Sequence, residues 1–88
     1  MGVTDEHSVR TADAQQAAYL RASLVEQRDQ LAGLLAKRRD EIVRRTGEGH
    51  HSVIGRLRSQ ARSEEAQLRY IEGMITRLDR RFTDQPGH

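Results

Sequence analysis

The sequence predicts an all-α fold in which two long helices pack antiparallel as a coiled-coil hairpin, which then assembles into a dimeric four-helix bundle. Three observations support this fold class. Apolar residues recur at alternating spacings of three and four residues in both halves of the chain. The only proline, Pro86, lies near the C-terminus, where it interrupts no helix. Two glycines, Gly47 and Gly49, divide the chain into two periodic segments of similar length.

The order of elements follows from local signals. Asp13 and Gln16 have the spacing of a capping box at a helix start, with Ser8 or Thr11 as earlier alternatives. Ser52 can cap a second helix. The expected elements are a flexible N-terminal arm at 1–11, a first helix at about 12–46, a loop at 47–51, a second helix at about 52–83 and a flexible tail at 84–88.

A heptad pattern identifies the residues expected between the two helices. In the second segment this pattern continues over four repeats with one polar interruption, Glu64, and Arg38 interrupts the first segment. The two polar residues either pair across the seam and fix the register, or both extend to solvent at its edge. The expected hairpin core consists of Leu20, Leu24, Leu31, Leu34, Leu35, Ile54, Leu57, Leu68, Ile71, Ile75, Leu78 and Phe82.

A second row of small and apolar residues follows the first helix beside its leucines. Small side chains let another helix approach closely, and a two-helix hairpin alone buries little apolar surface, so this row predicts a dimer interface. The alternative is that its alanines only favour helix formation at exposed positions. This alanine seam consists of Ala18, Ala22, Val25, Ala32, Ala36 and Val43.

The half of the chain around the expected loop is basic. It has eight basic residues against Asp40, Glu41 and Glu48, a net charge of +5 in a chain of net charge +2. Such a cluster attracts phosphates, an anionic membrane surface or an acidic protein, although no interleaved aromatic residues support stacking on bases. The alternative is a solvated, partly salt-bridged helix surface. This basic tip consists of Lys37, Arg38, Arg39, Arg44, Arg45, Arg56, Arg58 and Arg62.

The residue types that perform catalysis or bind metals are not arranged for either task. The chain has no cysteine, which excludes disulfides and thiol chemistry, and His50 and His51 are adjacent, so their side chains diverge. No catalytic motif is present, and we expect no enzyme activity, metal or cofactor. No apolar stretch is long enough to cross a membrane, and we expect a cytoplasmic protein.

One stretch resembles part of an enzyme family. The first helix of the small all-helical chorismate mutases is similar to the stretch that contains Leu20-Arg21, Leu31, Leu34-Leu35 and Lys37-Arg38-Arg39. The resemblance implies that an early arginine and a later lysine bind substrate carboxylates. Arg21 matches the arginine, but the lysine position falls near Gly47, and a third helix is missing.

The sequence therefore favours a small interaction module, an adaptor or regulator, that acts through helix packing and its basic tip. Its expected partners are a second copy of the chain and a further, acidic protein. The alternative is a nucleic-acid-associated protein that binds phosphate backbones non-specifically through the same arginine-rich tip.

Overall fold

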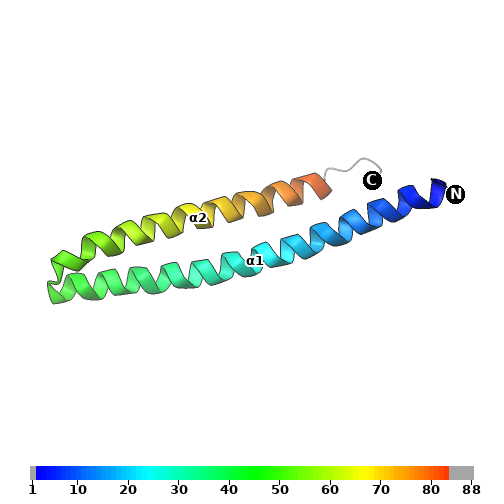
Figure 1. Cartoon of the computed structure of the whole chain (residues 1–88). Coiled ribbons are helices and arrows are strands. Elements are labelled where there is room, and N and C mark those ends of the chain that lie inside the picture. The colour runs from blue at the N-terminus through cyan, green and yellow to red at the C-terminus, as the bar shows by residue number, and fades with distance from the viewer. Residues whose placement is uncertain (1, 84–88) are drawn as a thin grey trace.

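The chain folds as two α-helices that pack against each other in opposite directions, as Figure 1 shows for the computed structural model. The structure describes residues 2–83, with side chains described for residues 12–81. Helix α1 spans Gly2–Glu48 and helix α2 spans His51–Thr83. The molecule measures 71 × 18 × 16 Å. The prediction of an all-helical hairpin is confirmed.

Helix α1 begins ten residues earlier than expected, at Gly2 instead of near residue 12. Asp13 and Gln16 lie inside the helix with exposed side chains, so they do not form the helix start. Once a helix has formed, each further residue adds a hydrogen bond at low cost, and no proline or glycine lies between residues 3 and 12 to stop it. The mobility expected of residues 1–11 stays a prediction, and the expected tail at 84–88 lies outside the described residues.

The turn between the helices is a Schellman motif centred on Gly49. The His50 N–H donates to the Arg45 carbonyl at 3.0 Å, and the Gly49 N–H donates to the Thr46 carbonyl at 3.2 Å. Gly49 has a φ of +78°, which glycine adopts without the steric penalty of a Cβ atom. Between the two helices lie only Gly49 and His50, so the connection is shorter than the expected loop at 47–51.

Helix α2 starts one residue before the expected position. Ser52, the expected cap, lies within its first turn. The residue that precedes the helix is His50, whose carbonyl accepts a hydrogen bond from the Val53 N–H at 3.3 Å. The capping prediction is therefore wrong, because the Schellman turn brings the chain directly into α2.

The core between the helices is thin. Glu64 is the buried charged residue, at 9% exposure. The buried hydrophobic side chains are Leu24, Leu35, Ile54, Leu57, Ala61 and Ile75. Four further residues of the expected core are only partly buried, namely Leu31, Leu68, Ile71 and Leu78.

Two leucines of the expected core lie at its margin instead. Leu20 is 45% exposed and Leu34 is 49% exposed, whereas Leu35 is only 3% exposed. Neighbouring residues on a helix point about 100° apart, so Leu34 and Leu35 cannot both face α2. The side chain of Phe82, also expected in the core, lies outside the described ones.

Candidate interaction surfaces

Half of the expected basic tip is already neutralised within the hairpin. Two of its arginines pair with carboxylates on α2, and two pair with carboxylates of α1 itself. The pairs are Arg38 with Glu64 at 3.0 Å, Arg39 with Glu65, Arg44 with Glu48 at 3.9 Å and Arg45 with Glu41 at 4.0 Å. The salt-bridged interpretation of this cluster is therefore correct for these four residues.

The most enclosed of these pairs crosses the seam. Arg38 Nε donates to Glu64 Oε1 at 3.0 Å, and Arg38 Nη2 donates to Glu64 Oε2 at 3.1 Å. The two side chains are 25% and 12% exposed, so they pair at the seam instead of extending to solvent. The hydrogen bonds raise the pKa of Arg38, with a smaller contribution from Coulomb attraction. A bidentate contact of this kind fixes both the axial position and the rotation of one helix relative to the other.

A second bidentate ion pair joins the helices near the end away from the turn. Arg21 Nε donates to Asp79 Oδ1 at 2.6 Å, and Arg21 Nη2 donates to Asp79 Oδ2 at 3.1 Å. These hydrogen bonds lower the pKa of Asp79 below its ordinary value, and Coulomb attraction acts in the same direction. Arg21, which the enzyme resemblance matches to a substrate-binding arginine, thus binds a carboxylate of its own chain.

The same effect acts on the carboxylate that pairs with Arg39. The pKa of Glu65 is lowered, first by its hydrogen bond from Arg39 and then by Coulomb attraction to Arg39 and Arg69. Partial burial opposes this shift. Ion pairs along one flank therefore hold the two helices in register.

The remaining four residues of the basic tip do not form one patch. Lys37, Arg56, Arg58 and Arg62 are exposed, and none pairs with a carboxylate among residues 12–81. From the helical spacing, Lys37 and Arg56 lie on one flank of the hairpin, and Arg58 and Arg62 lie on the other. The unpaired charge is thus divided between two sides of the rod.

His50 in the turn and His51, the first residue of α2, both lie exposed. His50 Nδ1 is 3.2 Å from Arg45 Nη1, so this ring interacts with a neighbouring cation. No group of three metal-ligating side chains occurs among the described residues. Neither described helix is long and apolar enough to cross a membrane.

Most of the alanine seam lies exposed on the surface of α1. Val43 is 72% exposed and Val25 is partly buried. The other members, Ala18, Ala22, Ala32 and Ala36, are all exposed. The row is therefore available for contact with another helix.

Sequence reasoning missed a second surface, which spans both helices on the opposite flank of α1. The sequence pattern allowed this surface to be found. When Arg21, Arg28 and Leu35 occupy seam positions, Leu20 and Leu34 lie together on this flank. We call this surface the uncharged face. It consists of Leu20, Ser23, Gln27, Gln30 and Leu34 of α1 and Gln60, Ser63, Gln67, Tyr70 and Met74 of α2.

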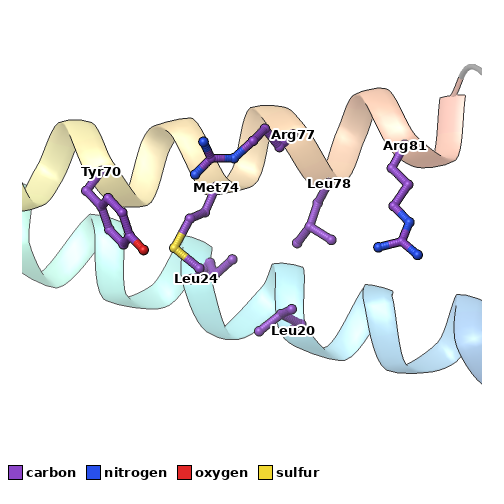
Figure 2. A pocket seen from close by; sticks show the side chains of 7 residues that line it. All are labelled: Leu20, Leu24, Tyr70, Met74, Arg77, Leu78 and Arg81. Atoms are coloured by element: carbon purple, nitrogen blue, oxygen red, sulfur yellow. The ribbon is translucent and has the colours of Figure 1, made fainter.

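A groove of about 280 Å³ lies at one end of the uncharged face. Figure 2 shows Met74 pointing from α2 toward Leu24 on α1, with the ring of Tyr70 beside it. Two arginines of α2 lie at the groove as well. The lining residues are Leu20, Leu24, Tyr70, Met74, Arg77, Leu78 and Arg81.

The chain matches no protein-family model, no curated protein and no solved structure.

Proposed function

We propose that this protein is an interaction module that pairs with a second copy of itself along the alanine seam and presents the rest of its surface to another protein. The observation that carries this proposal is the imbalance between the core and the exposed apolar surface. Among residues 12–81 the core contains six buried hydrophobic residues, while Tyr19 and Val43 on α1 are 81% and 72% exposed. Small domains with so little buried surface are commonly stabilised by association.

The alanine seam supports a contact between the α1 helices of two copies. Small side chains such as Ala18, Ala22, Ala32 and Ala36 allow two helix backbones to approach to about 8 Å, the lower end of the usual interaxial range. Asp29 interrupts the row between Val25 and Ala32. A two-fold axis near the middle of the seam would place Ala18 of one copy near Val43 of the other. The resulting assembly is a dimeric four-helix bundle with α1 helices at its centre.

Light scattering tests this proposal directly. We expect the protein to have twice the mass of one chain, and an Ala32→Glu variant, which places a charge in the seam, to be monomeric with its helical content retained. A Gln30→Glu variant is the matched control, because it adds the same charge at an exposed position on the other flank of α1. A wild-type monomer, or equal behaviour of the two variants, would contradict the proposal.

The same samples test the nucleic-acid alternative. With the unpaired basic residues divided between two flanks, we expect no appreciable binding to a mixed-sequence oligonucleotide. If the chain binds nucleic acid through phosphates, the logarithm of its affinity will fall linearly with the logarithm of salt concentration. Such a complex, weakened by changing Arg56 and Arg58 to glutamine, would replace the protein-adaptor proposal.

A further inference from the structure

The uncharged face is unusual for this chain, in which 32% of the residues are charged. None of its ten residues carries a charge. The ten residues at the mirrored positions on the other flank include six charged ones, which are Asp29, Arg58, Arg62, Glu65, Arg69 and Glu72. Exposed apolar side chains also gather here, with Leu20, Leu34 and Tyr70 at 45%, 49% and 66% exposure. Depletion of charge together with exposed aromatic and aliphatic residues is typical of the centre of a protein interface.

The groove gives this face a position for a large apolar side chain. Leu20 and Leu24 contribute its α1 side, and Met74 and Leu78 contribute its α2 side. Methionine adapts its shape to different partners, because its side chain is unbranched and flexible. Tyr70 adds an aromatic wall with a hydroxyl group at its outer end.

Both ends of the face are basic. Arg77 and Arg81 lie at the groove, and Figure 2 shows the Arg81 guanidinium extending from α2 toward α1. Lys37 and Arg56 lie on the same flank toward the turn. None of these four side chains has an ion-pair partner among residues 12–81. Arg56 and Arg77 are about 32 Å apart along α2, at 1.5 Å per residue.

We propose that the uncharged face binds an acidic amphipathic helix of another protein. The partner helix places a large apolar side chain in the groove and runs along the face with its apolar stripe against Leu34 and Tyr70. Its carboxylates pair with Arg77 and Arg81 at one end and with Lys37 and Arg56 at the other. This inference rests on the proposed adaptor function and identifies the chemistry of its partner.

Charge complementarity selects this occupant over a second copy of the chain. Two uncharged faces that meet across a two-fold axis would bring basic ends together in either orientation of the axis. Like charges brought together across an interface oppose association. An acidic helix meets the same residues with opposite charge, and its attraction to them weakens with salt.

Two synthetic helical peptides provide the test. Both are about 28 residues long and carry leucine at the a and d positions of four heptads. One has glutamate at the flanking e and g positions, and the other has lysine there. We expect fluorescence anisotropy to show binding of the glutamate peptide to the full chain, weaker binding at higher salt, and no binding of the lysine peptide. Equal binding of the two peptides, or none of either, would overturn the proposal.

Matched variants locate the binding site. Changing Arg77 and Arg81 to glutamine should weaken binding of the glutamate peptide about tenfold, the effect of losing two exposed ion pairs. Changing Arg62 and Arg80 to glutamine removes the same charge from the same helix outside the face, and should leave binding within twofold. An equal effect of the two double variants would mean general electrostatic attraction and would overturn the proposal.

A pair of added carboxylates tests the groove itself. Met74→Glu should abolish peptide binding, whereas Thr76→Glu, which adds the same charge on the other flank of α2, should not. Repeating the titration with the monomeric Ala32→Glu variant separates the two proposals. Binding retained in that variant supports the acidic-helix site independently of the dimer. If Met74→Glu instead converts a dimer into a monomer, the face is occupied by a second copy and the inference is wrong.

Discussion

Leu34 and Leu35 are neighbours of the same residue type with opposite environments, and replacing each with alanine tests the register of the hairpin. Leu35 is 3% exposed and is the most buried hydrophobic residue among residues 12–81, whereas Leu34 is 49% exposed. Both alanine variants keep high helix propensity, so a difference between them reports packing against α2.

The structure gives a different cost for each variant. Removing a buried leucine side chain costs about 2–5 kcal/mol, and a thin core that collapses partly around the space places Leu35→Ala near the lower end, at about 2–3 kcal/mol. Leu34 has about half of its surface in water already, so Leu34→Ala should cost less than about 1 kcal/mol. With an m-value of about 1 kcal/mol/M in urea, the urea midpoint of Leu35→Ala should fall by about 2 M more than that of a surface substitution.

Urea unfolding followed by circular dichroism at 222 nm measures both costs. Running each variant at two protein concentrations separates loss of hairpin packing from loss of self-association. We expect Leu35→Ala to cost at least 1 kcal/mol more than Leu34→Ala at both concentrations. Equal costs would refute the seam described here, because they would mean that the two adjacent residues are equally buried.

Three further predictions concern the turn, the ion pairs and pH. Gly49→Ala should lower the free energy of unfolding by about 1 kcal/mol or more, because a φ of +78° is strained for alanine. Gly33→Ala has open space around its Cβ position and should raise the free energy of unfolding by about 0.5–1 kcal/mol. Thermal melts of the two variants distinguish the opposite signs. Replacing either Arg38 or Glu64 with leucine should lower the melting temperature, and the double replacement should restore most of it, since apolar side chains can substitute for an enclosed ion pair. The ion pair of Asp79 lowers the pKa of this carboxyl in the folded state. Its stabilisation is therefore complete above the unfolded-state pKa of about 4 and is lost as pH falls through the folded-state pKa. Urea midpoints measured from about pH 5 to about pH 2 should consequently decline less in Asp79→Asn than in the wild type.

The hairpin could be predicted from the sequence because the heptad pattern is nearly complete over α2, where it gives the strongest helical signal. Ile54, Leu57 and Ile75 lie in the core as expected. The pairing of Arg38 with Glu64 was one of two interpretations of two polar residues at seam positions, and the structure decides between them.

The seam of α1 was harder to predict, since leucines occupy adjacent positions there. Leu34 and Leu35 point about 100° apart, and each supports a different seam on α1. In the structure Leu35 lies in the core, and Arg21 takes the seam position next to Leu20, where it meets Asp79 of α2. Arg38 lies at the seam in both registers and meets Glu64. Long arginine side chains pack their methylene groups at the seam while the guanidinium reaches a partner, and a count of apolar residues does not register this contribution.

The candidate surfaces depended on this register. The alanine seam was identifiable because its small residues repeat along one helix. The uncharged face was missed because it combines residues from both helices and because Leu20 and Leu34 were assigned to the core, although they are 45% and 49% exposed. In the basic tip, conspicuous as a charge count, half of the basic residues form ion pairs. The count included Glu41 and Glu48 but not Glu64 and Glu65, which α2 brings to Arg38 and Arg39.

Small-angle X-ray scattering of the full chain shows whether this hairpin pairs side by side with a second copy. We predict a forward intensity that corresponds to twice the mass of one chain and a cross-section larger than 18 × 16 Å. Because the two-fold axis lies near residue 30, the copies are staggered, and the maximum dimension should be about 85 Å, compared with 71 Å for one hairpin. A single-chain mass with a radius of gyration near 20.2 Å would contradict the claim by showing that one hairpin is complete alone. A doubled mass with a nearly doubled length would also contradict it, because the copies would then meet end to end and leave the alanine seam uncovered.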